Sequence, residues 1–198
     1  VSLIDLAPTF LEAAGLRIPE AVTGRSLLPL LDGRSPGRTE VVFGIERHFP
    51  GSRPNGAGYP SRGIRTGEYL YIRNLTPQAN PCGDHPGPVW PADDPVGGYG
   101  DTDGGPTKTY LWRNREKFPE LFRLAFGKRP AEELYAVRED PFNMRNLAGK
   151  ADYEKIRKDL AARLDDYLRR TADPRALGRG EELDAVMRRF PAVPRGAR

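Results

Sequence analysis

The clearest pattern in the chain is a helical repeat of apolar residues near its C-terminal end. In the segment 152–171, "DYEKIRKDLAARLDDYLRRT", an apolar residue recurs every four positions among charged residues. Positions four apart share one face of a helix, so this segment is expected to form a long amphipathic helix. Its apolar face consists of Ile156, Leu160, Leu164 and Leu168. The charged tail that follows is expected to be loosely held, apart from a short helix over 181–189.

The first residues of the chain also repeat at helical spacing. Pro8 lies inside this pattern, which is tolerated only in the first turn of a helix, and Gly15 is a natural helix stop. We therefore predict a helix over about 7–14, followed by a connector and a short helical turn at 26–31. The apolar face of the first helix needs a partner, and it consists of Leu3, Leu6, Phe10, Leu11 and Ala14.

Short runs rich in β-branched and aromatic residues predict four strands, over 40–46, 63–66, 69–74 and 132–137. Only Gly67 and Glu68 separate the second run from the third, which indicates a tight hairpin. Strands and helices in this order predict an α+β fold. Its small antiparallel β-sheet would be packed by the long C-terminal amphipathic helix and joined by long Gly/Pro-rich loops.

The longest stretch without a periodic pattern is 75–108, which is rich in proline and glycine. It also contains Trp90 and Tyr99, a composition that differs from that of a flexible linker. We therefore expect an ordered loop that lies over another surface. Residues 109–127 predict a helix that is interrupted near Pro119.

Composition excludes several classes of protein. The formal net charge is +4, but acidic residues are interleaved with the arginines and no concentrated basic patch stands out, so we expect no nucleic-acid partner. No apolar run is long enough to span a membrane, and no signal peptide opens the chain. Cys82 is the only cysteine, which excludes an internal disulfide and a cysteine-based metal cage. Because Val1 already lies in a helical pattern, we expect a part of a longer polypeptide.

Several segments, taken in order, resemble one family. "VSLIDLAPTFLEAAGL", "SRGIRTGEYLYIRN" and "EELYAVREDPFNMRNLAG" are similar to the C-terminal part of sulfatases of the alkaline-phosphatase-like superfamily. The middle, from "IERHFPGSRPNGAGYPSRGIRT" to "GKRPAEELY", is closer to the heparan N-sulfatase (N-sulfoglucosamine sulfohydrolase) branch. The resemblance covers about residues 1–175. It implies that 1–40 is left over from an N-terminal sulfatase domain, that 41–171 is a C-terminal subdomain, and that 172–198 is a charged tail.

The resemblance implies a hydrolase of sulfate esters or sulfamates. In that family a formylglycine, made from the cysteine of C-x-P-S-R, works beside a calcium ion in the N-terminal domain. "GYPSR" at Gly58 is close to this motif but follows "VSLIDLAPTF", whereas the family's motif lies near the N-terminus. Gly58 has no side chain to oxidise, and Cys82 lies in "NPCGD". We therefore predict no catalytic residue and no metal or cofactor in this chain, and expect formylglycine and calcium in a missing N-terminal domain.

Candidate substrate-binding residues follow the first strand. Glu46, Arg47 and His48 lead directly from the strand end onto a Gly-rich loop, where a rigid scaffold often presents binding groups. An arginine suits a sulfate or carboxylate, and a histidine can donate to a sugar hydroxyl or a sulfamate. The alternative is that Glu46 and Arg47 form a surface ion pair and that His48 caps the loop.

A second candidate region is "YGDTDGGPTK", where Asp103 could bond a sugar hydroxyl and Lys108 could approach an anion. Alternating carboxylates can indicate a calcium loop, but the further ligands of an EF-hand are absent. The alternative is a run of ordinary Asp-Gly turns.

From these observations we expect a wall of the substrate cleft in a sulfatase-like hydrolase acting on sulfated carbohydrate, perhaps N-sulfoglucosamine. The chain alone would be inactive, and its main partner would be the missing N-terminal sulfatase domain. A signal peptide on that domain would make the protein periplasmic or secreted. The alternative is a stand-alone carbohydrate-binding or protein-interaction module without catalytic activity.

Overall fold

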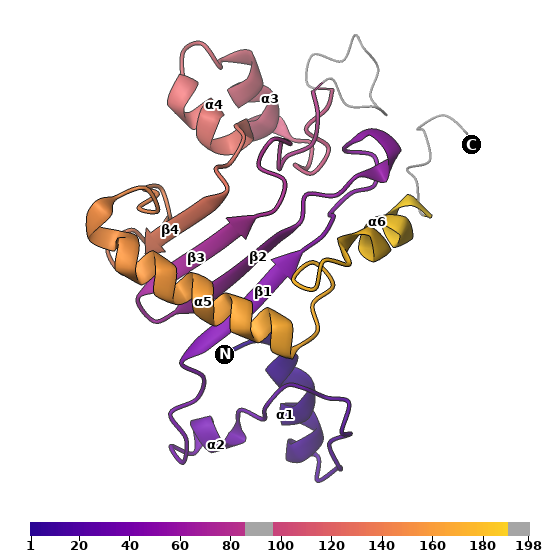
Figure 1. Cartoon of the computed structure of the whole chain (residues 1–198), viewed down its shortest axis with the longest axis vertical. Helices are drawn as coiled ribbons and strands as arrows, with labels where there is room; N and C mark the ends of the chain where they lie inside the picture. Colours follow the sequence, from indigo (N-terminus) through magenta and orange to yellow (C-terminus); the bar gives the residue numbers. More distant parts are fainter. Residues whose placement is uncertain (86–96, 190–198) are drawn as a thin grey trace.

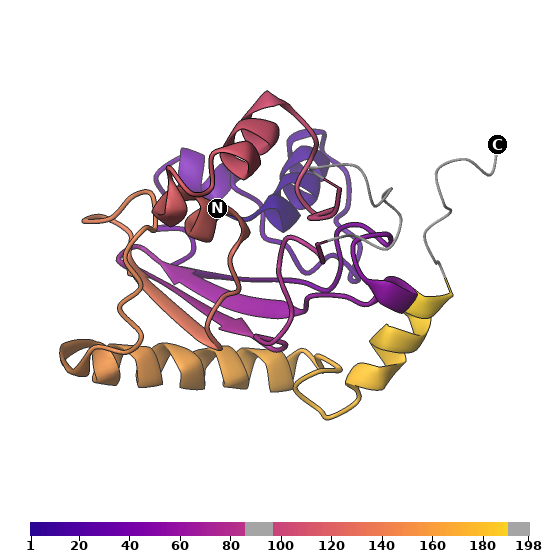
Figure 2. The same cartoon turned by 90° about the horizontal axis from the view of Figure 1, so that it is seen from above.

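The computed structural model describes residues 1–85 and 97–189, and Trp90 lies outside these ranges. Its centre is a four-stranded antiparallel sheet in the order β1-β2-β3-β4, with one long helix, α5, across one face (Figures 1 and 2). This is the α+β arrangement that the sequence predicts. The strands are β1 (Glu40–Ile45), β2 (Ser61–Thr66), β3 (Tyr69–Asn74) and β4 (Glu132–Ala136).

Six α-helices and three short 3₁₀ turns surround the sheet within the described residues. The α-helices are α1 (Leu6–Ala13), α2 (Leu28–Leu31), α3 (Pro106–Arg113), α4 (Pro119–Phe126), α5 (Glu154–Arg170) and α6 (Gly180–Arg188). The 3₁₀ turns are η1 (Leu3–Asp5), η2 (Pro54–Gly56) and η3 (Ala151–Tyr153). The helix expected over 109–127 is thus two helices, because Pro119 can begin a helix but cannot continue one. None of the described helices is long and apolar enough to cross a membrane.

The β2–β3 hairpin has the predicted two-residue turn. Arg65 pairs with Leu70 across the hairpin, and Gly67 and Glu68 form the turn. The Thr66 hydroxyl accepts the backbone N–H of Tyr69 at 3.0 Å, which closes the turn. The hairpin therefore fixes the register of the two central strands, and with it which side chains face α5.

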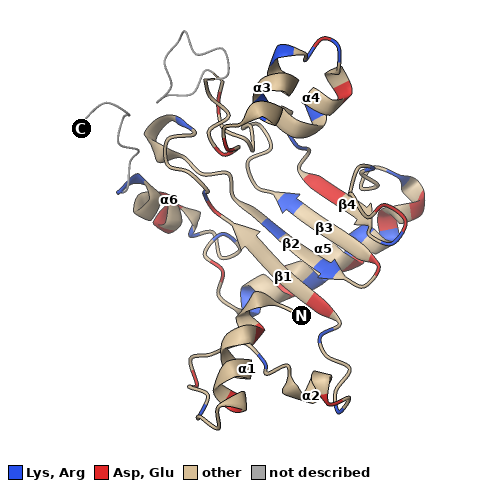
Figure 3. Ribbon diagram, turned by 180° about the vertical axis from the view of Figure 1, so that it is seen from behind, with Lys and Arg blue, Asp and Glu red and all other residues tan. Residues whose placement is uncertain are grey.

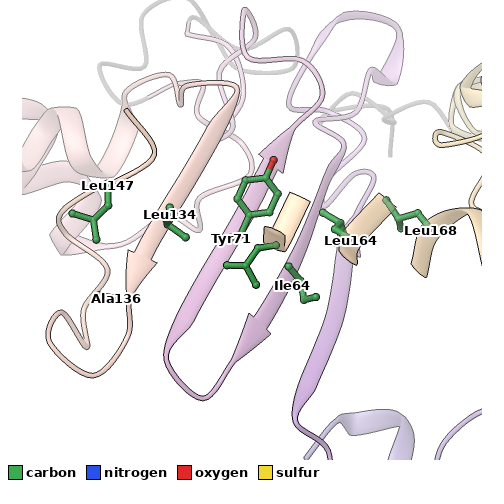
Figure 4. Close-up of a cluster of buried hydrophobic side chains, with 8 residues drawn as sticks. Ile64, Tyr71, Leu134, Ala136, Leu147, Leu164 and Leu168 are labelled. Carbon is green, nitrogen blue, oxygen red and sulfur yellow. The ribbon is translucent and has the colours of Figure 1, made fainter. Parts of the chain in front are cut away.

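The main core lies between the sheet and α5 (Figure 4). Ile64, Tyr71 and Leu134 point from β2, β3 and β4 toward the helix and are fully buried. The helix contributes three of the four predicted positions as buried side chains, Leu160, Leu164 and Leu168, while Ile156 packs at the margin. Each such leucine contributes about 1.5–3 kcal/mol by leaving water, so this contact is the main source of stability.

The opposite face of the sheet is partly open, and no helix of the described residues lies across it (Figure 3). Phe43 lies directly over Gly63 of β2, where a Cβ atom would come within 2.3 Å of the phenylalanine ring. Phe43 and Ile45 remain 42% and 46% exposed. A sheet face with large exposed apolar residues is a typical contact surface for another domain.

A buried carboxylate fixes the N-terminal helix. Asp5 is fully buried and accepts two hydrogen bonds from the Arg38 guanidinium, at 2.7 and 2.5 Å, and one from the backbone N–H of Arg25 at 2.8 Å. Arg38 lies just before β1, so these bonds join α1 to the sheet. Leu3 and Phe10 nevertheless remain 85% and 68% exposed to solvent. The apolar face of the first helix therefore lacks a partner among the described residues of this structure.

This carboxylate gives the fold a predicted acid sensitivity. Hydrogen bonds from Arg38 hold the pKa of Asp5 well below its ordinary value of 3.8. Because this pKa is lower in the folded than in the unfolded chain, the stabilisation is complete above about pH 4 and is lost as the pH falls below it. We expect Asp5→Asn to lower the free energy of unfolding by about 1–3 kcal/mol at neutral pH. Thermal unfolding at several pH values should show this difference shrinking in acid, and a constant difference would contradict the assignment.

Candidate functional site

One end of the sheet gathers the longest loops of the molecule, at the top of Figure 1. We call the segments 46–60, 75–85 and 97–105 the loop end. Backbone hydrogen bonds join them directly: Asp84 donates to Ser52 at 2.8 Å, Tyr99 donates to Asp84 at 2.9 Å, and Asp101 donates to Cys82 at 3.0 Å. The described parts of the long Gly/Pro segment are therefore ordered against the loop that follows β1, as the sequence predicts.

Asp101 is the centre of the loop end. Its carboxylate accepts hydrogen bonds from the Phe49 backbone at 2.9 Å, the Ser52 hydroxyl at 2.7 Å and the Arg53 guanidinium at 2.7 Å. The side chain is only 8% exposed. The sequence indicates the nearby Asp103 instead, because alternating aspartates in a Gly-rich loop give no sign of which one is buried.

Arg53 and Asp101 together form a buried anchor for the loop end. The side chain of Arg53 is 3% exposed and donates to the backbone oxygens of Asn80 and Pro81, at 2.5 and 2.8 Å, as well as to Asp101. One guanidinium thus fixes all three segments of the loop end. A buried arginine is stable here because each of its bonds goes to a charged or strongly polar acceptor.

His48 lies at the surface of this anchor. Its side chain is 58% exposed, and Nδ1 lies 3.8 Å from a carboxylate oxygen of Asp101. That separation suits an electrostatic contact but is too long for a hydrogen bond. Among the predicted site residues, His48 therefore combines an exposed hydrogen-bonding group with a rigid support.

Glu46 and Arg47 have structural partners, which differ from the surface ion pair considered above. Both carboxylate oxygens of Glu46 are engaged, one by Arg62 at 2.5 Å and the other by Arg175 at 2.7 Å. Arg47 donates to the backbone oxygens of Gly56 and Met187, at 3.0 and 2.7 Å. These two residues hold the loop that carries His48.

The two candidate residues of the second region, Asp103 and Lys108, differ in their exposure to solvent. Lys108 is 8% exposed, and its ammonium donates to the backbone oxygens of Gly98, Tyr99 and Thr102 at 2.9–3.0 Å. The expectation that Lys108 approaches an external anion is therefore corrected: its charge is used to close the turn that contains Asp101. Asp103 is exposed on the same turn.

Aromatic rings attach α3 and α4 to the loop end. The Tyr99 ring lies 5.0 Å from the His85 ring and 4.9 Å from the Phe126 ring, and His85 also lies 5.7 Å from Trp112. Tyr99 has a positive φ of 45°, a conformation that costs free energy in a non-glycine residue and persists because the surrounding contacts fix it. The two helices and the loop therefore form one packed unit.

Known proteins were compared with this chain in sequence and in fold. No family model matches it. An ulvan-active sulfatase of Formosa agariphila is 30% identical over 169 residues, which is 85% of this chain and 29% of that protein. A Δ4,5-hexuronate-2-O-sulfatase of Bacteroides thetaiotaomicron is 25% identical and covers 86% of the chain. The chain is similar to part of a sulfatase.

Structural comparison shows a similar fold. The solved structure of a 2-O GAG sulfatase is 24% identical, has a TM-score of 0.51, and covers 86% of this chain and 25% of that one. The resemblance to sulfatases predicted from the sequence thus extends to the fold. This sulfatase-like chain spans less than a third of the length of the two curated relatives.

In the described part of the sulfatase-like chain, the residues do not match a formylglycine and calcium site of the family. A Cβ atom at Gly58 would lie 2.3 Å from the backbone oxygen of Glu46, so this position accepts no side chain, and "GYPSR" cannot be a nucleophile motif with a lost cysteine. In residues 1–85 and 97–189, no three His, Cys, Asp or Glu side chains are grouped so that they could hold a metal ion. No chemical step is therefore assigned to either group here.

Proposed function

We propose that this chain is one part of a sulfatase-like hydrolase of sulfated carbohydrates, and that its loop end forms one wall of the substrate cleft. The observation that carries the proposal is His48, an exposed imidazole held beside the buried Asp101–Arg53 pair. Similarity to sulfatases over most of the chain supports the reaction class. A rigid loop at the end of a sheet is a common place for groups that select a substrate.

In this proposal His48 orients the substrate and does not attack sulfur. An imidazole N–H can donate to a sulfate oxygen or to a sugar hydroxyl, and the nearby Asp101 carboxylate favours a ring orientation with an N–H toward it. Arg47 contributes through the loop, since Nη1 of its guanidinium already binds two backbone oxygens. Asp103, exposed on the adjoining turn, is a further hydrogen-bonding group for a sugar hydroxyl.

The proposed substrate is a sulfated sugar, either a sulfate ester or a sulfamate. Two relatives that cover most of this chain are described as ulvan-active and as acting on a hexuronate 2-O-sulfate. The resemblance of the middle segments to heparan N-sulfatases favours N-sulfoglucosamine as one candidate. Both kinds of substrate present anionic oxygens and hydroxyls that suit the polar groups at His48 and Asp103.

The proposal also requires a partner domain that supplies the formylglycine and calcium. The exposed face of β1, with Phe43 and Ile45, and the exposed Leu3 and Phe10 near α1 are the surfaces that such a domain would cover. Burial of a large side chain of this kind stabilises an interface by about 1.5–3 kcal/mol. Sulfur chemistry would then take place outside this chain, next to the wall that it provides.

We expect the purified 198-residue chain to show no turnover of a chromogenic sulfate ester, with or without added calcium. The complete hydrolase, with its C-x-P-S-R segment, should hydrolyse a sulfated carbohydrate under the same conditions. Turnover by the chain alone would overturn the assignment. Binding of a sulfated sugar by the chain together with an inactive complete protein would instead favour a carbohydrate-binding module.

A further inference from the structure

We infer that α6 and the segment before it, residues 173–188, form a clamp that positions the His48 loop, and that Arg175 is its principal positioning residue. For its effect on substrate this inference rests on the proposed function above. The sequence predicts a loosely held tail with a short helix over 181–189, and the structure contains this helix as α6. The structure also packs α6 beside η2 in the loop that follows β1 (Figure 1). Three sets of contacts support the clamp.

The first contact is an arginine between two acids. The Arg175 guanidinium donates twice to Glu46, at 3.1 and 2.7 Å, and twice to Asp184 of α6, at 3.2 and 2.6 Å. Its side chain is 15% exposed. Because the planar guanidinium binds both carboxylates in a fixed geometry, it holds α6 at a set distance from the end of β1.

The second contact reaches the same glutamate from the sheet. Arg62 of β2 donates to Glu46 at 2.5 Å and to Asp173 at 2.9 Å, with its side chain only 8% exposed. Glu46 is therefore shared by two arginines, one on the rigid sheet and one in the C-terminal segment. This charge network joins three regions that are far apart in sequence.

The third contact lies on the other side of the loop. The backbone oxygen of Met187, in the last turn of α6, accepts the Arg47 guanidinium at 2.7 Å. A cation at this end of a helix also interacts favourably with the helix dipole. Met187 is 8% exposed, and a Cβ atom added at Gly58 would lie only 3.1 Å from its side chain. The helix thus contacts the loop before and after His48.

The contacts of the clamp involve different residues from those of the hydrophobic core. The sheet and α5 keep their buried apolar contacts without α6, whereas Glu46 and Arg47, which precede His48, bind residues of the clamp. Loss of the clamp should therefore loosen the loop without unfolding the domain. In the complete hydrolase, a loosened loop would raise KM for a sulfated oligosaccharide and leave kcat nearly unchanged.

The test is Arg175→Gln, with Arg179→Gln as its matched control. Arg179 lies in the same segment, is 51% exposed, and has a single, long contact of 3.6 Å with Glu182, so the same loss of charge should have little effect there. We expect Arg175→Gln to speed hydrogen exchange of the loop amides, including the Tyr59 N–H that donates to Glu46, by about tenfold or more in the full chain. Asp184→Asn should loosen the same amides.

In the complete hydrolase, Arg175→Gln should raise KM for a sulfated oligosaccharide about tenfold. Exchange equal to that of the control would overturn the clamp, and faster exchange with an unchanged KM would overturn its role in positioning. If the wild-type hydrolase does not cleave sulfated carbohydrate, the proposed function fails. The exchange comparison then still decides whether the clamp exists.

Discussion

Replacing Arg53 by methionine is expected to destabilise the loop end by about 3–5 kcal/mol, the usual cost of removing one partner from a buried ion pair. Methionine retains much of the length of the side chain but none of its hydrogen bonds. The carboxylate of Asp101 would remain buried without its cation, and the backbone oxygens of Asn80 and Pro81 would lose their donor. All three segments of the loop end should become mobile together.

Hydrogen exchange of segments 46–60 and 97–105 measures this effect, and thermal unfolding measures its consequence for the domain. Arg65→Met is the control, because Arg65 lies exposed on β2 and undergoes the same chemical change. We expect the control to keep wild-type exchange at the loop end. If the two variants behaved alike, the anchor role of Arg53 and Asp101 would be wrong.

The fold could be predicted from the sequence wherever burial follows a local period. Leu160, Leu164 and Leu168 recur every four residues, and they are the side chains that α5 buries. The hairpin followed from the two residues between its strands, and the break at Pro119 from the chemistry of proline. In each case a few neighbouring residues determine the backbone conformation.

The site could be predicted only in part, because its contacts join distant positions. Glu46 directly follows β1, as the sequence indicates, but its partners are 16 and 129 positions away. No local pattern indicates such pairs. For the same reason the contacts of 173–188 with the loop after β1 could not be predicted, since Arg175 meets Glu46 only after the chain has folded.

Lys108 shows a second reason why the site could be predicted only in part from the sequence. A lysine in the first turn of a helix beside a Gly-rich loop is typical of a solvent-facing or anion-binding position. Here the loop folds back so that three backbone oxygens surround the ammonium. The conformation of glycine-rich backbone, including the positive φ at Gly98 and Tyr99, determines this outcome and is not encoded in a periodic pattern.

The second large effect is expected for His48→Ala in the complete hydrolase. If His48 orients the substrate through one charge-assisted hydrogen bond, its loss should cost about 1.5–3 kcal/mol of binding. This corresponds to a rise of about 10- to 150-fold in KM for a sulfated oligosaccharide. The turnover number should change little, because in the proposed wall His48 orients the substrate and does not contact the reacting sulfur.

The most direct test of the proposed wall is therefore to compare KM and kcat of His48→Ala for two substrates. For a sulfated oligosaccharide, KM should rise and kcat should stay near the wild-type value. For a small aryl sulfate that does not reach the loop end, both constants should be nearly unchanged. Equal losses of kcat with the two substrates would place His48 in the chemistry, and unchanged constants with both would show that the loop end is not part of the substrate cleft.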